Sequence, residues 1–137
     1  MNVTIINIRD ELLIGQVVNT NASTMSKLLT EAGMEVRKTM VVGDVYDDIW
    51  AAVDEAMRES DAVLVTGGLG PTKDDITKAV LCQISGSKGM VEHPGQLEQI
   101  HQFLKNRGLD ALPSNLAQAQ VPDQAEVIVN RLGTAPI

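Results

Sequence analysis

The stretch VLVTGGLGPTKDDITKAV, which runs from Val63 to Val80, places an apolar run, a glycine turn and a helical pattern in direct succession. Its apolar start predicts a strand over 62–66. After the turn, apolar residues recur at helical spacing, at Ile76, Ala79, Val80 and Ile84, and Gly86 is placed to end that helix. A strand that enters a helix through a glycine-rich turn is one step of an alternating α/β fold.

The chain on either side repeats this step. Val3 to Ile8 is a β-branched run typical of a central strand covered on both faces, and 36–42 reads as another strand. Helical spacing recurs in three sets: Met25, Leu28, Leu29 and Ala32, ended by Gly33; Ile49, Ala52, Val53, Ala56 and Met57; and Leu97, Ile100 and Leu104 within 96–106, ended by Gly108. Thr20 or Asn21 is expected to cap the first helix, and 126–129 to form a short strand. This alternation predicts a three-layer α/β/α sandwich with a mostly parallel sheet.

Length and composition fit one compact domain over 1–137 with an aliphatic core. Hydrophobic residues make up 44% of the chain, but Tyr46, Trp50 and Phe103 are its only aromatic residues. Eighteen acidic residues against eleven Lys and Arg give a net charge of −7, the wrong sign for binding nucleic acid through its phosphates. A single cysteine, Cys82, excludes an internal disulfide and a multi-cysteine zinc site. The N-terminus resembles neither a signal peptide nor a membrane span, so a cytoplasmic location without a membrane partner is expected.

The glycine turn is suited to an anion. Gly67, Gly68 and Gly70 allow positive φ and a close approach of the backbone, and Thr72 is expected to cap the following helix. The unpaired N–H groups and partial positive charge of a helix N-terminus attract phosphate, and Lys73 adds a cation. Because the pattern completes neither GxxxxGK[ST] nor GxGxxG, a Walker-type kinase and a Rossmann dehydrogenase are disfavoured.

A second loop, Arg9 to Asn21, leaves the carboxyl end of the first predicted strand. Loops at the carboxyl ends of parallel strands share one edge of the sheet, so this loop and the glycine turn are expected to converge. Asp75, at the end of the turn, has two interpretations. As a first-turn carboxylate it stabilises the helix through the dipole, and as a site residue it is an acid, a base or a ligand of phosphate-bound Mg²⁺.

These motifs together resemble the molybdenum-cofactor-biosynthesis, or molybdopterin-binding, domain of the MoaB and MogA type. They are most similar to the N-terminal domain of the CinA, or competence/damage-inducible, family. The resemblance spans nearly the whole chain: DELLIGQVVNTN at 10–21, VGD at 42–44, TGGLGPTKDDIT at 66–77, PSNLAQAQVP at 113–122 and NRLGTAP at 130–136. It implies a molybdopterin-binding-domain-like sandwich with a pocket for a phosphorylated pterin or nucleotide.

The resemblance also implies a chemistry, the metal-dependent hydrolysis of a nucleotide-sugar pyrophosphate such as ADP-ribose within pyridine-nucleotide recycling. The implied catalytic residues are Asp75, Glu11 and Asp10, and Asp75 with Asp10 would hold a divalent metal ion, Mg²⁺ or Co²⁺. The implied ligand-binding residues are Gly67, Gly68, Gly70, Thr72, Lys73, Thr77, Asn19, Asn130, Gly133 and Thr134. Two alternatives stay open: a non-catalytic sensor that binds molybdopterin or a nucleotide, and an assembly domain.

Family relatives suggest partners as well. They form dimers or trimers, so a homo-oligomer is expected, and no deamidase activity is expected because that activity belongs to a separate C-terminal domain. The sequence departs from the family pattern at Arg9, where glycine is usual, and at Ile137, where the family continues, which suggests a C-terminally shortened domain. Arginine would be strained if position 9 required positive φ; otherwise its guanidinium could fill the pocket or contact a phosphate.

Overall fold

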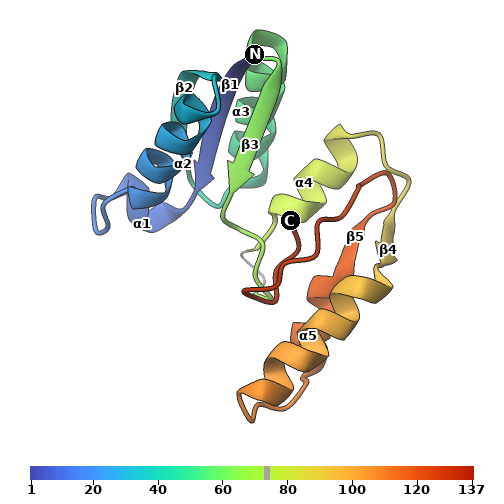
Figure 1. The fold of residues 1–137 in the computed structure, drawn as a ribbon. Helices are drawn as coiled ribbons and strands as arrows, with labels where there is room; N and C mark the ends of the chain where they lie inside the picture. The colour runs from blue at the N-terminus through green and yellow to red at the C-terminus, as the bar shows by residue number, and fades with distance from the viewer. Residues whose placement is uncertain (73–74) are drawn as a thin grey trace. The chain divides into compact units, whose positions relative to one another are not determined.

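Figure 1 shows the fold of the computed structural model, which describes residues 1–72 and 75–137. The chain divides into two compact units, Met1–Gly68 and Leu69–Ile137, called here the first and the second unit. The first contains β1 (Asn2–Ile8), α1 (Asp10–Leu13), α2 (Thr20–Glu31), β2 (Glu35–Val42), α3 (Tyr46–Glu59) and β3 (Ala62–Thr66). The second contains α4 (Thr77–Ile84), β4 (Met90–Glu92), α5 (Pro94–Asn106), α6 (Pro113–Leu116), the 3₁₀ helix η1 (Ala117–Ala119) and β5 (Gln120–Pro122). The expectation of a single domain over 1–137 stays a prediction.

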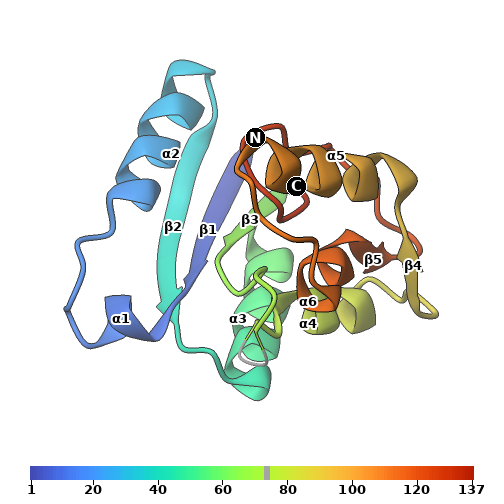
Figure 2. The ribbon, with the colours of Figure 1, turned by 90° about the horizontal axis from the view of Figure 1, so that it is seen from below.

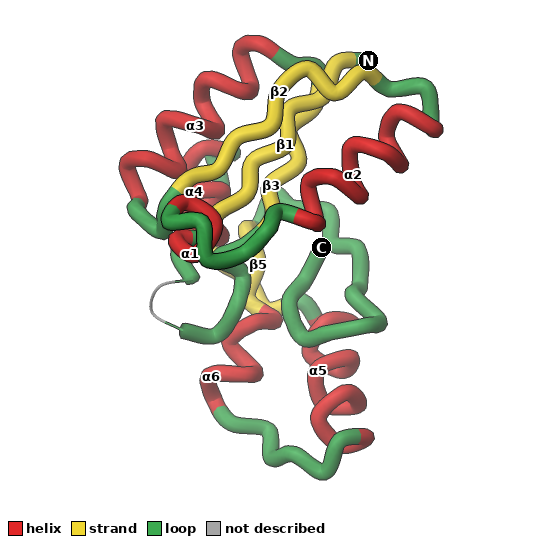
Figure 3. Tube along the Cα trace, turned by 90° about the vertical axis from the view of Figure 1, so that its left-hand side faces the viewer, coloured by secondary structure: helices red, strands yellow, loops and turns green. Residues whose placement is uncertain are grey.

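The first unit is built on a parallel three-stranded sheet in the order β2–β1–β3. The predicted central strand is confirmed, because β1 pairs with both neighbours and every residue from Val3 to Ile8 is buried. Figure 3 shows α2 and α3 on opposite faces of this sheet. A parallel sheet with helices on both faces is the three-layer α/β/α arrangement that the alternating sequence predicts.

The core is aliphatic, as the composition predicts. Its largest fully buried apolar side chains are Val3, Ile5, Ile6, Ile8, Ile49, Val80 and Ile100. β-Branched side chains of this kind pack well on the pleated surface of a sheet, which explains their concentration in β1. No helix in the described part of the chain is both long enough and apolar enough to span a bilayer.

An apolar stripe on α3 covers one face of the sheet. Ile49, Ala52, Val53 and Ala56 are buried, as their spacing predicts, because residues three or four apart share one side of a helix. Met57, assigned to the same stripe from the sequence, is 55% exposed. It directly follows Ala56 and so lies about 100° further around the helix, at the margin of the stripe.

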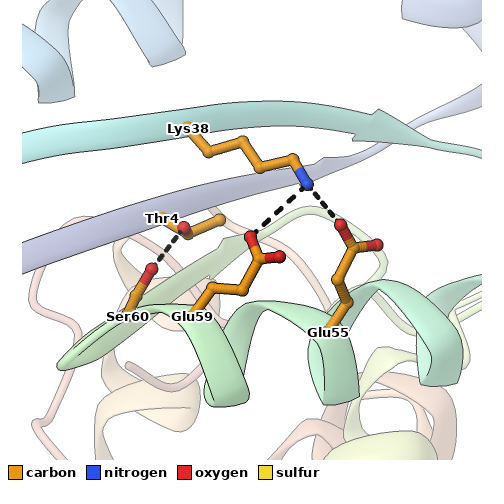
Figure 4. Close-up of polar contacts among 5 residues, drawn as sticks. All are labelled: Thr4, Lys38, Glu55, Glu59 and Ser60. Atoms are coloured by element: carbon orange, nitrogen blue, oxygen red, sulfur yellow. Dashed lines mark hydrogen bonds and ion pairs between the residues drawn. The ribbon is translucent and has the colours of Figure 1, made fainter.

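Polar contacts hold α3 against the same face (Figure 4). Lys38 Nζ on β2 is hydrogen-bonded to Glu55 of α3 and lies 3.8 Å from Glu59 Oε2. Thr4 Oγ1 on β1 and the hydroxyl of Ser60, directly after α3, share a hydrogen bond of 2.6 Å. Lys38 and Thr4 are opposite each other in the sheet register, so both anchors lie on the α3 face.

The start of α2 differs from the prediction by one residue. Its N-cap is Asn19, whose Oδ1 accepts a hydrogen bond of 3.1 Å from the Ala22 N–H. Thr20 and Asn21, the predicted caps, are the first two residues of the helix itself. Asn and Thr side chains all favour the N-cap position, so residue type alone does not identify the cap among these three residues. The conformation of the preceding loop determines it. The predicted end is confirmed, with Gly33 at a φ of +79°.

The second unit contains the predicted helices and a small sheet that was not predicted. α4 and α5 end before Gly86 and Gly108, both at positive φ, as expected. β4 and β5 pair antiparallel, with Val91 opposite Val121. Strands of three residues carry too little alternation to be recognised from sequence.

The predicted strand over 126–129 is wrong. These residues have no regular secondary structure, although the N–H groups of Ile128 and Ile137 each donate to the other's carbonyl oxygen, at 2.7 and 3.2 Å. One such pair closes a loop but does not extend into a ladder. The apolar run that suggested a strand therefore serves to hold the segment around 130–136 in a closed shape.

Candidate functional site

A cavity of about 230 Å³ lies in the first unit at the carboxyl ends of β1 and β3. It is lined by Asn7, Ile8 and Arg9 from the end of β1, by Leu12, Val17, Val18, Asn19, Thr20 and Asn21 from the first loop and the start of α2, and by Thr66 and Gly67 after β3. Figure 2 shows α1 at this end of the sheet. The predicted convergence of the two loops is therefore confirmed for the part of the glycine turn that lies in the first unit.

Gly67 lets the two loops approach closely. A Cβ at this position would lie 2.1 Å from the carbonyl oxygen of Ile8, and the φ of Gly67 is +98°. Both the contact and the backbone conformation exclude any larger residue. The first glycine of the turn is therefore needed to form the cavity wall, and the positive φ and close backbone approach expected from the sequence are confirmed at this position.

The N-terminus of α2 brings one backbone N–H without a partner in the described part of the chain to the residues that line the cavity. The Ala22 N–H is taken by Asn19 Oδ1, and the Thr20 N–H donates to the Val18 carbonyl oxygen at 2.8 Å. The N–H of Asn21 has no partner among the residues that the structure describes, and the first turn of α2 carries no acidic residue. An unpaired N–H at a helix N-terminus attracts an anion.

Arg9 lines the same cavity without backbone strain. Its φ is −169°, which is ordinary extended backbone, and its N–H donates to the Val42 carbonyl oxygen at 2.9 Å. The strained conformation considered from sequence is therefore excluded. Arg9 brings a positively charged residue to the wall of a cavity in an otherwise acidic chain.

Asp10 and Glu11 form the first turn of α1, but neither is among the residues that line the cavity. Asp10 Oδ1 accepts a hydrogen bond of 3.1 Å from the N–H of Asp44, and a Cβ on Gly43 would lie only 2.8 Å from the same oxygen. Glu11 is exposed. The Asp10 carboxylate therefore connects the first loop to the Val-Gly-Asp turn after β2.

In the second unit, the Asp75 carboxylate accepts hydrogen bonds from the glycine turn. Its Oδ2 accepts hydrogen bonds from the N–H of Thr72 at 2.8 Å and from the Thr72 hydroxyl at 2.5 Å. A Cβ on Gly70 would lie 2.6 Å from the same oxygen. Partial burial raises the pKa of Asp75, but hydrogen bonds from Thr72 and Gly70 and the charge of Lys78 outweigh it, so the pKa lies below its ordinary value.

The prediction that Thr72 caps the following helix is wrong, because α4 begins at Thr77. The Thr72 hydroxyl donates to Asp75 instead of accepting from a helical N–H, and this closes a separate turn before the helix. Thr77, a predicted ligand-binding residue, is fully buried. Lys73, also predicted to bind ligand, lies outside the described residues.

The predicted ligand residues Asn130, Gly133 and Thr134 share one loop of the second unit, and Gln96 of α5 holds it. Gln96 is fully buried, with its Nε2 donating to the Thr134 carbonyl oxygen at 2.9 Å and its Oε1 accepting from the Asn130 N–H at 3.3 Å. The Asn130 side chain donates to the Ala135 carbonyl oxygen at 2.8 Å. The loop is therefore shaped by its own amides together with one buried glutamine.

Sequence reasoning missed two residues of these sites. Asn7 lines the cavity from near the carboxyl end of the mostly apolar strand β1, and a polar side chain in such a strand was the available signal. Gln96 was assigned only to a helix, although it lies on the same side of α5 as the buried Ile100. Within 1–72 and 75–137, no three His, Cys, Asp or Glu side chains gather in a group that could hold a metal ion.

Known proteins similar to this chain share its sequence over nearly its full length. Residues 4–136 match the family model described as a probable molybdopterin binding domain. A CinA-like protein of Kosmotoga olearia is 43% identical over 136 residues, which cover 99% of this chain and 33% of that protein. A protein of Aeropyrum pernix is 40% identical over 132 residues, which cover 96% of this chain and 49% of the relative. The chain thus spans one third to one half of the length of these relatives.

Solved structures agree with the sequence comparison. The CinA protein of Thermoplasma acidophilum is 37% identical and superposes with a TM-score of 0.85, over 98% of this chain and 78% of that one. The tungsten-cofactor-synthesizing protein MoaB of Pyrococcus furiosus, at 19% identity and a TM-score of 0.60 over 78% of this chain and 64% of that one, shares the fold. With its motifs, its parallel sheet and its matched length in agreement, the chain belongs to the family of probable molybdopterin-binding domains and, within it, to the CinA-like proteins.

Proposed function

We propose that the chain binds a phosphorylated nucleotide or pterin in the cavity of the first unit. The observation that carries the proposal is the composition of the cavity wall. The Arg9 side chain and the unpaired Asn21 N–H suit a phosphate, and the apolar side chains of Leu12, Val17 and Val18 suit a heterocyclic ring. A ligand that carries both a phosphate and a heterocyclic ring matches the polar and the apolar residues of the cavity wall.

The net charge of −7 does not argue against a phosphorylated ligand. Charges further away than about 10 Å are largely screened at moderate salt, so the groups lining the cavity dominate the interaction. The family description and the cofactor synthesis named for MoaB support a pterin-type ligand, and the phosphate-binding features support a nucleotide equally well. Both classes share the phosphate and the flat ring.

The narrower proposal is hydrolysis of a nucleotide-sugar pyrophosphate such as ADP-ribose, with a divalent ion, Mg²⁺ or Co²⁺, required for turnover. The described residues do not form a ready metal site, because Asp10 and Asp75 already accept hydrogen bonds from the protein and no cluster of three ligands is described. No step of the hydrolysis is therefore assigned to a cation held by these two carboxylates. Binding without hydrolysis, as in a sensor, is the alternative that the same donor arrangement favours.

Titration calorimetry on the purified chain tests the binding proposal. Adenosine 5′-monophosphate, ADP-ribose and inorganic phosphate serve as probes, and the two nucleotides are expected to bind more tightly than phosphate alone. Arg9→Gln is expected to weaken nucleotide binding about tenfold, because a charge-assisted hydrogen bond is lost. Arg37→Gln, which changes an exposed arginine on β2 outside the cavity, is the matched control. Failure of every probe to bind, or equal effects of both substitutions, would exclude the cavity as the site.

A product assay separates hydrolysis from binding. ADP-ribose is incubated with the chain and Mg²⁺ or Co²⁺, with a chelator in the parallel sample, and release of adenosine 5′-monophosphate is measured. Metal-dependent release that disappears in Asp75→Asn supports the narrower proposal, whereas binding without release supports a sensor. The predicted homo-oligomer is checked on the same preparation by sedimentation equilibrium.

A further inference from the structure

His93 lies directly before α5 and accepts a hydrogen bond that closes the start of this helix. Its Nδ1 accepts from the N–H of Gln96 at 3.1 Å, and its own N–H donates to the Ala119 carbonyl oxygen at 2.9 Å. A side chain that accepts the N–H of the third helical residue acts as an N-cap. The first turn of α5 contains no acidic residue that could take over this role.

The residue that His93 caps also holds the loop over 130–135. Gln96 is fully buried, and its side-chain amide pairs with two backbone groups of that loop. The ring of His93 lies near the residue before the loop, because a Cβ on Gly95 would lie 3.2 Å from His93 Cε1 and 3.4 Å from Val129 Cγ2. The imidazole, the start of α5 and the loop are therefore connected within the second unit.

This arrangement requires a neutral imidazole. A ring nitrogen that accepts a hydrogen bond carries no proton, so the single ring proton of His93 lies on Nε2. A second proton, on Nδ1, would turn the acceptor into a donor that faces the Gln96 N–H, and it would place a positive charge at the positive end of the helix dipole. Histidine side chains change charge between about pH 5 and 8, and His93 is partly exposed, so a proton can reach it.

Few other charged groups surround His93. η1 and β5 contain no titratable residue, and the ion pairs among the described residues do not include this ring. The titratable side chains on the adjoining segments, from β4 through α5 to the loop, are all exposed: Glu92, Glu98, His101, Lys105 and Arg131. Carboxylates, lysine and arginine keep their charge in this pH range, so only the two histidines of these segments change charge.

We propose that protonation of His93 opens the start of α5 and releases the loop over 130–135, so that the shape of this loop depends on pH. The loop contains Asn130, Gly133 and Thr134, three of the residues predicted to bind ligand. The stabilising contact is present while the imidazole is neutral and is lost as the pH falls. The inference goes beyond the proposed function and does not depend on it, because every group involved belongs to the second unit.

Hydrogen exchange of the unmodified chain at about pH 7.5 and about pH 5.5, on either side of the histidine titration, tests the inference. Rates are converted to protection factors, because the intrinsic exchange rate itself changes with pH. The amides of Gln96 and Asn130 are expected to lose about fivefold in protection at the lower pH, the equivalent of one lost N-cap. Ile5 and Ile6 in β1 are expected to keep theirs. This comparison needs no variant.

Variants assign the pH dependence to the imidazole. Asparagine is a good N-cap that does not titrate, so His93→Asn is expected to keep high protection at both pH values. His93→Ala lacks an acceptor and is expected to show low protection at both. His101→Asn, which changes the exposed histidine on α5, is the control and should keep the loss seen in the unmodified chain.

Two results would overturn the inference. Equal protection of Gln96 and Asn130 at both pH values in the unmodified chain would show that the proton does not disturb the start of α5. A loss at the lower pH that persists in His93→Asn would assign it to another group. Neither result bears on nucleotide binding to the first unit, so a failure of this inference and a failure of the proposed function are distinguished.

Discussion

The N-terminus of α2 and the turn over Gly70–Thr72 both present backbone N–H groups that suit an anion, but the structure treats them differently. The first turn of α2 contains no acidic residue, and Asn21, whose N–H has no partner among the described residues, lines a cavity. In the turn, the carboxylate of Asp75 already accepts the N–H and the hydroxyl of Thr72. Both places have the donors of an anion site; a cavity lies beside the first, whereas the donors of the second are already taken by the protein.

The comparison shows that donors alone do not define a ligand site. A carboxylate three residues away satisfies the same N–H groups that would otherwise hold a phosphate, because both are anionic oxygen acceptors. A glycine-rich motif followed by aspartate can therefore exist in two stable states: its N–H groups bind either an external anion or the carboxylate of its own aspartate. The following variants distinguish these two states, from the largest expected effect to the smallest.

Gly67→Ala is expected to have the largest effect, because it destroys the cavity wall. The new Cβ would lie 2.1 Å from the Ile8 carbonyl oxygen at a φ of +98°, so steric overlap adds to backbone strain. We expect a loss of about 3 kcal/mol or more in the free energy of unfolding, measured by urea denaturation, together with loss of nucleotide binding. Gly86→Ala, at φ +73° with no atom within 4 Å, is the control and should lose about 1 kcal/mol from strain alone. Similar losses in both variants would show that the close contact is not required.

Gln96→Ala should have the next largest effect, because it leaves two part-buried backbone groups of the second unit unpaired. The Thr134 carbonyl oxygen and the Asn130 N–H lose their partner, for an expected cost of about 2 kcal/mol. Faster hydrogen exchange over 130–135 should accompany it. Gln102→Ala removes an exposed contact to Glu98 and should cost less than about 0.5 kcal/mol. Unchanged exchange over the loop in Gln96→Ala would contradict the role assigned to the buried amide.

Substitutions of Asn19 distinguish helix capping from ligand binding at the N-terminus of α2. Asn19→Ala loses the bond to the Ala22 N–H and should cost about 1 kcal/mol in the free energy of unfolding. Asn19→Asp keeps an acceptor at the cap but adds a negative charge beside the cavity. We therefore expect near-normal stability and at least several-fold weaker binding of adenosine 5′-monophosphate, measured by calorimetry. Equal nucleotide binding by Asn19→Asp and the unmodified chain would place the phosphate elsewhere.

Asp75 gives the smallest effect on stability and a clear dependence on pH. Because its pKa in the folded state lies below the ordinary 3.8, the charged carboxylate stabilises the fold above that pH, and this contribution is lost as the pH falls through the lowered pKa. Asp75→Asn should lose less than about 1 kcal/mol at neutral pH, since the carboxylate is partly exposed. The difference from the unmodified chain should shrink as the pH is lowered below 4. A difference that is constant with pH would mean that charge is not involved.

Asp75→Ala should free the N–H groups of the glycine turn to bind an external anion. With the carboxylate removed, the amides of the turn lose their internal acceptor. Inorganic phosphate is then expected to raise the melting temperature of the variant more than that of the unmodified chain. Potassium chloride at the same ionic strength is the control. An equal response of both proteins to phosphate would mean that the turn does not accept external anions.

Much of the fold could be predicted because it depends on local spacing. The β-branched run of β1, the stripes of α3 and α5 and the glycines that end α2, α4 and α5 each act over a few residues, so a linear pattern contains the information. The close approach of the loops after β1 and β3 could also be predicted, because neighbouring parallel strands end at the same edge of the sheet. The motifs from 10–21 to 130–136 were sufficient for the family.

Which partner each polar group finds was decided by the tertiary structure. Thr72 was expected to cap a helix and donates to Asp75 instead, and Asn7 looked like one more strand residue until its oxygen proved to be buried without a partner. Gln96 meets a loop more than thirty residues further along the chain. A hydrogen bond depends on the distance and direction between two atoms, and residue spacing fixes those only within a helix turn or a strand pair. Sequence therefore specifies the donors and acceptors, and folding specifies which of them are left for a ligand.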